Sequence, residues 1–245
     1  MSEAPDTPTE SHPADIEQIL LPPPSIWSII RGPMGVIVIN YTVFALSDIS
    51  YNVLQPVIFG APVAARGVGM SPRTIGITLG LNGLLNGIVQ SRLFPTALAR
   101  VGAKGLFMTG AIALVLAYAL YPALQSLATV TGGANFGVWI IVGLQIILQM
   151  AISSAYGCVN IFMVSVASPA ALGATNGVVQ TTVSVARAIG PAVATSLYAS
   201  SVQQNILGGY FVFLVLGALA ALCIWTSSLL PSLSRLQSSA EEDSP

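Results

Sequence analysis

Six long runs of apolar residues, almost free of charged side chains, follow one another along this chain and constrain its fold more than any other feature. They lie at about 34–60, 74–95, 105–124, 137–166, 176–199 and 208–230. A helix needs roughly 20 residues to cross about 30 Å of hydrocarbon, and each run is near or above that length. Turn segments such as TVTGGAN separate the runs. The sequence therefore predicts an all-α integral membrane protein with six transmembrane helices.

The charge content points the same way. Only 7% of the residues are charged and 54% are hydrophobic, whereas soluble domains carry roughly a quarter charged residues. A formal net charge of -1 leaves no basic face for a nucleic acid. We therefore expect a lipid bilayer around the chain, and no nucleic acid as a partner.

The ends of the chain differ from the apolar part. We expect residues 1–33, rich in proline and acidic residues, to form a disordered cytosolic tail, 34–230 a six-helix lobe, and 231–245 a second cytosolic tail. Short cytosolic loops attract Lys and Arg. Two basic residues, Arg66 and Arg73, lie on one side of the predicted membrane, against five on the side of the N-terminus: Arg31, Arg92, Arg100, Lys104 and Arg235. This predicts that both termini are cytosolic and leaves open whether the membrane is plasma or vacuolar.

Polar residues recur along four of the six predicted helices at spacings that place them on one helix face. We predict that these faces meet around a cavity for a small-molecule substrate. The predicted lining residues are Asn40, Tyr51, Gln55, Asn82, Asn86, Gln90, Gln145, Gln149, Tyr156, Asn160, Asn176, Gln180 and Ser184. The helices at 105–124 and 208–230 are apolar nearly all round and are expected to face lipid. The alternative for each polar residue singly is a hydrogen-bond link between helices.

Asp48 and Arg187 are the only ionisable side chains near the middle of a predicted span. Holding a charge at that depth costs between about 2.5 and 17 kcal/mol, so each needs a partner or a water-filled cavity. Our hypothesis is that the two pair with each other and that Asp48 exchanges protons during transport. The alternative is a structural ion pair without a transport role.

Glycine and proline mark two further features. Gly190 and Pro191 follow Arg187, and a proline inside a helix predicts a kink that serves either packing or a hinge. A glycine stripe runs along the second predicted helix, at Gly76, Gly80, Gly83 and Gly87. Such a stripe is a close-packing surface or an interface that slides.

Several segments resemble the C-terminal six-helix half of a major facilitator superfamily transporter, in particular fungal members of the drug:proton antiporter and zinc-induced facilitator-like groups. The segment GATNGVVQTTVSVARAIGPAVATSLY at 173–198 is similar to the eleventh helix of that family. SDISYNVLQPVIFG resembles its acidic seventh helix, and SRLFPTALARVGAKGLF its basic loop between the eighth and ninth helices. The resemblance covers roughly residues 25–232.

The resemblance implies a lobe that rocks against a second lobe around a midplane site, driven by a proton or substrate gradient. It matches Asp48 to the seventh-helix acid and Arg187 to the basic residue before A-I-G-P. An intact member has about twelve helices, and the signatures of the N-terminal half do not occur in this sequence. The resemblance therefore implies a truncated product, with a second six-helix lobe or a second copy as partner.

Two functions remain from this reading. The first is secondary transport of a small organic solute or drug-like compound, with proton coupling as its expected form. The second is a membrane interaction protein, or inactive fragment, that does not transport. An enzyme is not expected, because the predicted spans hold no histidine and no second carboxylate. We accordingly predict no catalytic residue, metal or cofactor, and the substrate, its direction and the coupling ion stay open.

Overall fold

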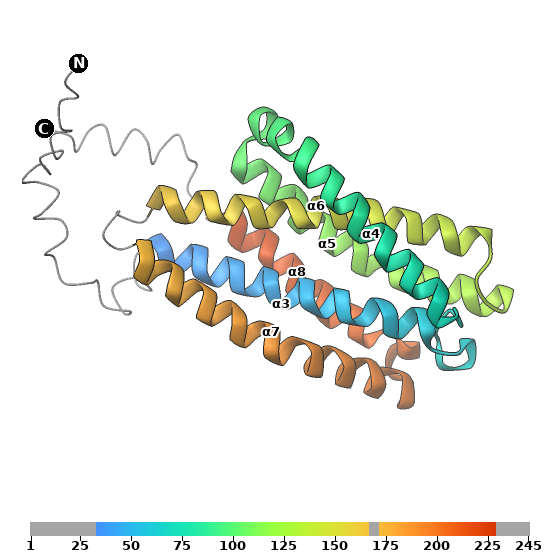
Figure 1. Cartoon of the computed structure of the whole chain (residues 1–245). Coiled ribbons are helices and arrows are strands. Elements are labelled where there is room, and N and C mark those ends of the chain that lie inside the picture. Colours follow the sequence, from blue (N-terminus) through green and yellow to red (C-terminus); the bar gives the residue numbers. More distant parts are fainter. Residues whose placement is uncertain (1–32, 167–171, 229–245) are drawn as a thin grey trace, which may run out of the picture.

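The computed structural model describes residues 33–166 and 172–228, and every regular element in these two ranges is a helix (Figure 1). The longer helices are α3 (Pro33–Gly60), α4 (Pro72–Arg92), α5 (Phe94–Thr131), α6 (Phe136–Val166), α7 (Leu172–Gln203) and α8 (Phe211–Ser228). Two short helices of the 3-10 type, η1 (Val63–Ala65) and η2 (Ile206–Gly209), lie in the connections after α3 and α7. Apart from residue 33, the tails expected at 1–33 and 231–245 lie outside the described residues.

A long helix covers each of the six apolar runs, so the expectation of an all-α chain is confirmed for the described residues. By length and composition, three segments in these ranges can cross a membrane: Gly35–Gly60, Phe94–Thr131 and Phe136–Ser165. The apolar segment Phe211–Ser227 is shorter, and the remaining helices, α4 and α7, carry many glycines and polar residues. That all six helices span a bilayer therefore stays a prediction.

Local sequence signals fix where several helices begin and end. Ser71 caps α4, because its side chain accepts a hydrogen bond from the backbone N–H of Thr74 at 3.2 Å. α5 ends at Gly132, whose φ of 77° is the left-handed conformation that glycine adopts without strain. Asn135 then accepts a hydrogen bond from the backbone N–H of Val138 at 2.9 Å and so stabilises the first turn of α6.

The basic segment at 96–104, expected to be a loop, is part of α5. The helix bends at Gly102, where φ is 75° and ψ is 162°, a conformation that residues with a side chain rarely adopt. The short helix before the bend is anchored on α6 by Phe94, whose ring would lie 2.4 Å from a Cβ added to Gly157. Only a few of its residues pack on the bundle, among them Ala97 and Leu98. This weak apolar pattern explains why the sequence did not predict it.

Close approach of helix backbones holds the bundle together. α5 packs along α6 and α8, and α3 packs along α7 and α8. Between α5 and α6, a Cβ added to Gly110 would lie 2.7 Å from Ala155 Cβ and 2.9 Å from the carbonyl oxygen of Ala151. Small residues permit this distance in lipid, where van der Waals packing and interhelical hydrogen bonds drive helix association.

Buried aromatic rings fill the space between α3, α5 and α8. The rings of Tyr51 and Tyr118 lie 5.7 Å apart, and Tyr121 stacks on Phe213 at 5.1 Å. Tyr118 also donates a hydrogen bond to the carbonyl oxygen of Ser47 at 2.7 Å. α5 therefore supplies one face of the core, which corrects the expectation that this helix faces only lipid.

Candidate functional site

Asp48 lies in the middle of α3 and is the only acidic residue in the described part of the chain. It is 8% exposed. Tyr156 donates a hydrogen bond to its Oδ2 at 2.7 Å, while Asn52 and Gln149 donate to its Oδ1 at 2.9 and 3.4 Å. Two of these donors belong to α6, and Asn52 lies one turn further along α3. Because a charge in a low-dielectric interior is costly unless it is hydrogen-bonded, these donors stabilise an ionised carboxylate.

Tyr156 also connects Asp48 to Arg187 of α7. The guanidinium carbon of Arg187 lies 5.5 Å from the centroid of the Tyr156 ring, within the range of a cation–π contact. The sequence suggested a direct ion pair between the two charged residues. In the structure Tyr156 contacts both of them instead, using its hydroxyl for Asp48 and its ring face for Arg187.

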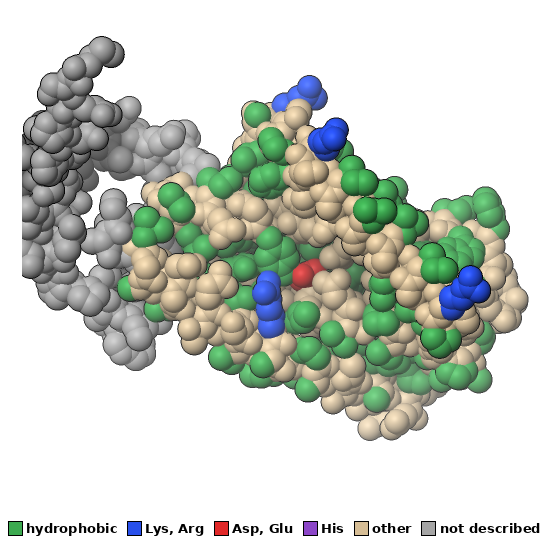
Figure 2. Space-filling view, viewed as in Figure 1, with side chains coloured by type: hydrophobic (Ala, Val, Ile, Leu, Met, Phe, Trp, Pro, Cys, Tyr) green, Lys and Arg blue, Asp and Glu red, His purple; other side chains and the backbone are tan. Residues whose placement is uncertain are grey.

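These groups lie at a depression in the surface of the helix bundle. Figure 2 shows one acidic side chain in a hollow between α6 and α3, with a basic side chain beside it. The acidic side chain is Asp48, because the described ranges contain no other acidic residue. The hollow thus combines a carboxylate and a basic side chain with apolar and polar walls, a composition suited to a small organic molecule.

Aromatic packing fixes the position of Tyr156. The ring of Tyr41 lies edge-on at 5.8 Å, and the ring of Phe44 lies edge-on at 5.2 Å. Both belong to α3, so the tyrosine is held against the same helix that carries Asp48. Such edge-to-face pairs add about 0.5 to 1.5 kcal/mol beyond their buried area.

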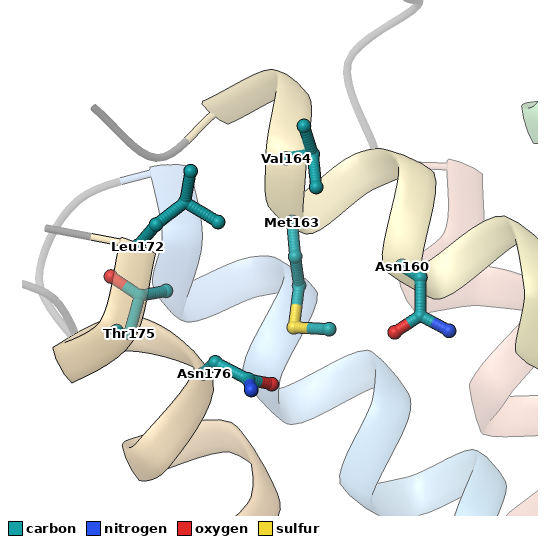
Figure 3. A pocket seen from close by; sticks show the side chains of 7 residues that line it. Asn160, Met163, Val164, Leu172, Thr175 and Asn176 are labelled. Atoms are coloured by element: carbon teal, nitrogen blue, oxygen red, sulfur yellow. The ribbon is translucent and has the colours of Figure 1, made fainter. Parts of the chain in front are cut away.

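A second cavity, of about 320 Å³, lies near the end of α6 and the start of α7. Figure 3 shows Asn160 and Asn176 on its opposite sides, with Met163 between them. Both asparagines are exposed, and Asn160 donates to the carbonyl oxygen of Tyr156 at 3.5 Å. Two predicted lining residues from different helices therefore meet at one cavity, one turn of α6 away from Tyr156.

Among the other predicted polar residues, those of α7 are exposed, whereas one on α4 forms a hydrogen bond to a neighbouring helix. On α7, Gln180 and Ser184 are exposed, like Arg187. On α4, Gln90 donates a hydrogen bond to the hydroxyl of Ser154 on α6 at 3.1 Å. The polar face of α7 is thus open to a ligand, whereas Gln90 links two helices.

Several buried polar atoms have no hydrogen-bond partner among the residues that the structure describes. Gln145 of α6 is fully buried, and neither its nitrogen nor its oxygen is paired. The same holds for both side-chain atoms of Gln125 on α5 and for Oε1 of Gln149. On α4, the Oδ1 atoms of Asn82 and Asn86 are also unpaired. Each unpaired group costs about 1 to 3 kcal/mol, so these side chains are able to bind a polar ligand or water at little further cost.

Three residues of the predicted polar face of α3 do not line the hollow together with Asp48. Asn40 is buried against α8 and donates to Thr226 Oγ1 at 2.8 Å and to Ser227 Oγ at 3.1 Å. Tyr51 is buried among the aromatic rings of α5, and Gln55, one turn later, is 2% exposed. The physical reason is geometric: the predicted arc of roughly 80° is wide enough to meet different neighbours at its two edges.

The glycine features also differ in their surroundings. Gly190 is a contact point between α7 and α3, because an added Cβ would lie 2.6 Å from Ile49 Cγ2. α7 continues through Pro191 as far as Gln203. By contrast, the glycine stripe of α4 is exposed, and a Cβ added to any member would meet no neighbouring helix of the described part of the chain within 4 Å; its members are Gly76, Gly80, Gly83 and Gly87.

Sequence reasoning missed several residues that contribute polar groups to this region. Asn52 escaped because it is a single residue one turn from Asp48. Tyr118, Tyr121 and Gln125 are spaced by three and four, which places them on one face of α5. That spacing was a readable signal, and it was overlooked because the rest of the helix is so apolar.

The comparisons with known proteins point to one group. The chain is 30% identical over 185 residues to the efflux pump azaK of Aspergillus niger, covering 74% of this chain and 39% of that protein. It is 29% identical over 231 residues to the major facilitator-type transporter psiT2 of Psilocybe cyanescens, covering 90% of this chain and 43% of that protein. It is 25% identical over 179 residues to the major facilitator superfamily multidrug transporter mfsB of Aspergillus fumigatus, covering 69% of this chain and 29% of that protein.

The second and third of these relatives are named as major facilitator transporters and the first as an efflux pump, and the chain spans between 29% and 43% of the length of each. No protein-family model matches the chain. No solved structure matches it either.

Proposed function

We propose that this chain forms one six-helix lobe of a major facilitator superfamily transporter of the drug:proton antiporter or zinc-induced facilitator-like group. In this proposal all six helices span the bilayer, both termini are cytosolic, and the hollow beside Asp48 takes a small organic solute or drug-like compound. The similarity to relatives named as transporters supports the assignment, because it extends over 69% to 90% of the chain.

The observation that carries the proposal is the environment of Asp48. Its carboxylate receives hydrogen bonds from Tyr156, Gln149 and Asn52, and all three donors are uncharged. A carboxylate inside a membrane helix costs free energy. Carboxylates at such positions therefore mark ion and substrate pathways. The hollow in Figure 2 gives solutes access to it.

The same contacts support the proposal of proton coupling. When Asp48 takes up a proton, Tyr156 no longer donates to a charged acceptor, and Arg187 loses the negative charge beyond the tyrosine ring. The connection between α3, α6 and α7 then weakens, because hydrogen bonds to charged groups are roughly twice as strong as neutral ones. In our proposal this change lets the lobe switch between its two transport conformations, and the release of substrate favours the loss of the proton.

A second six-helix lobe is the partner that the proposal requires. The exposed glycine stripe of α4 and exposed apolar residues of the same helix, such as Ile77 and Leu84, offer a face on which another set of helices packs. That lobe comes either from a second copy of this chain or from another polypeptide. The same open face favours the second candidate function, a membrane protein that associates with other helices and does not transport.

Substrate protection of cysteine labelling tests the proposal. In proteoliposomes, Gln180→Cys is expected to react with a polar maleimide, and compounds that are taken up should slow this reaction. Ile189→Cys is the matched control, because the residue is also exposed but lies on the opposite side of α7. The chain is tested alone and together with the part of the psiT2 relative that lies outside the matched region. Uptake in neither case, with helix association retained, would favour the interaction protein.

A further inference from the structure

A groove on the outside of the lobe, away from Asp48, lies between α5 and α8. Its volume is about 520 Å³. α5 contributes Val115, Tyr118, Ala119 and Pro122, and the α8 side contributes Tyr210, Phe213, Leu214, Gly217, Ala218 and Ala221. The hydroxyl of Tyr118 already donates to Ser47, and the surface that lines the groove is mostly apolar. Leu214 on its rim is 61% exposed.

One end of the groove carries a positive charge. The guanidinium carbon of Arg66 lies 5.1 Å from the centroid of the Tyr210 ring, and that ring lines the groove. Arg66 Nη2 donates to Asn205 Oδ1 at 3.5 Å, and its Cδ would lie only 2.6 Å from a Cβ added to Gly209. The arginine is therefore held in place at the mouth of the groove. Four of the five N–H groups of a guanidinium remain for another acceptor after the bond to Asn205.

The hydroxyl of Tyr210 is also fixed, because it shares a hydrogen bond of 2.8 Å with Ser126 of α5. Tyrosine and arginine side chains are frequent where membrane helices reach the headgroup region. Arg66, Asn205 and Tyr210 lie in the connections after α3 and α7, so this polar end coincides with the ends of the helices. The apolar part of the groove extends from there toward the middle of α8.

The length of the groove fits one membrane leaflet. From Tyr210 to Ala221 an α-helix rises about 16 Å at 1.5 Å per residue. Half of the hydrocarbon thickness of a bilayer is about 15 Å. A chain that starts at Arg66 and follows the groove therefore ends near the bilayer midplane.

We infer that this groove is a binding site for one glycerophospholipid, with the phosphate at Arg66 and one acyl chain between α5 and α8. Arginine suits this role, because its planar fork of donors matches the oxygens of a phosphate. An acyl chain matches the apolar walls, and the length of the groove matches one leaflet. The site does not depend on the transport proposal, because Arg66 and Ala218, on which its test relies, are not among the residues placed at the hollow around Asp48.

Native mass spectrometry of the detergent-purified chain tests this inference by counting bound lipids. Dioleoyl phosphatidylglycerol is titrated in parallel with dioleoylglycerol, which has the same acyl chains but no phosphate. We expect one site for the phospholipid and binding at least tenfold weaker for the diacylglycerol. A hydrogen bond between charged groups has about this effect on affinity. Equal binding of the two lipids would overturn the assignment of the phosphate to Arg66.

Two pairs of variants locate the site. Arg66→Gln should weaken phospholipid binding about tenfold, whereas Arg73→Gln, the same change at an exposed position in the first turn of α4, should not. Ala218→Phe should fill the groove and remove binding, whereas Leu222→Phe, on the same helix but outside the groove, should leave it unchanged. If Arg66→Gln does not fold, Ala218→Phe still tests whether the lipid lies in the groove, and the diacylglycerol comparison still tests whether the phosphate is recognised. Unchanged binding in Ala218→Phe would place the lipid elsewhere.

Discussion

Tyr156 donates a hydrogen bond to Asp48 from a neighbouring helix, with 2.7 Å between Oη and Oδ2, and this contact joins the hollow to the rest of the bundle. The same tyrosine ring lies under Arg187. Tyr156 of α6 thus contacts both Asp48 of α3 and Arg187 of α7, so a change in either residue alters its contacts.

Removal of the Tyr156 hydroxyl should destabilise the helix bundle, although the ring stays in its place beside Asp48. Tyr156→Phe keeps the ring and its packing against Phe44, but Asp48 loses its shortest hydrogen bond. We expect the free energy of unfolding to fall by about 1.5 to 3 kcal/mol, as for hydrogen bonds to charged groups. Titration with denaturing detergent, followed by circular dichroism, measures the change. Tyr41→Phe is the control, because it leaves every hydrogen bond of Asp48 in place, and a loss as large as in Tyr156→Phe would contradict the assignment.

The contact between Arg187 and Tyr156 should be weak and measurable only as a coupling. Arg187 is exposed, and cation–π contacts at exposed sites contribute about 0.5 to 1 kcal/mol. A double-mutant cycle with Arg187→Gln and Tyr156→Leu should return a coupling energy in that range. A coupling indistinguishable from zero would show that the ring does not hold the guanidinium.

Neutralisation of Asp48 should abolish uptake driven by a pH gradient. Asp48→Asn is similar in volume and retains partners among the side chains that now bond to the carboxylate, so the helical content should be unchanged. Uptake of fluorescent drug-like compounds into proteoliposomes, with the chain supplied together with a second lobe, measures the effect. Asp48→Glu should retain part of the activity, because it keeps an ionisable group. Undiminished gradient-driven uptake in Asp48→Asn would exclude this residue as the proton carrier.

The same substitution should lower the stability of the helix bundle at one glycine and leave it almost unchanged at another. Gly110→Val pushes a side chain into Ala155 and into the carbonyl oxygen of Ala151, so we expect it to destabilise the lobe by about 1 to 3 kcal/mol. Gly80→Val meets no neighbouring helix within the described residues and should leave the stability of the lobe almost unchanged. If α4 packs on a second lobe, Gly80→Val should reduce transport alone. Thermal unfolding in detergent and the uptake assay together distinguish the two sites.

Replacement of an unpaired amide should stabilise the bundle. Gln125 is 1% exposed, and neither of its side-chain polar atoms has a partner in the described ranges 33–166 and 172–228. Gln125→Met keeps the shape and removes the cost of the unpaired groups, so we expect an increase of about 1 kcal/mol in the free energy of unfolding. Gln149→Met is the comparison, because it removes a donor to Asp48 and should lower the same quantity. A decrease for Gln125→Met would mean that this amide is hydrated.

Much of the candidate site was readable from the sequence, because polar residues are rare in these helices and therefore conspicuous. Asp48, Gln149 and Tyr156 were among the predicted site residues, and the structure brings them into contact. The pairing of Asp48 with Arg187 through a tyrosine was not readable. Two charges on separate helices suggest a direct ion pair, and only the packed side chains reveal what lies between them.

From the sequence alone it could be predicted that the chain is helical and apolar, and roughly where each helix lies. The reason is local: backbone groups in hydrocarbon must be satisfied within their own segment, so the length of an apolar run predicts a helix. Which neighbour each polar residue meets is known only from the packing of the helices against one another. Along α3, Asn40 contacts α8 while Asp48 contacts α6, although both lie within one predicted arc. A central helix has neighbours on several sides. Periodicity gives the direction in which a side chain points around the helix axis, but it does not say which neighbouring helix lies in that direction.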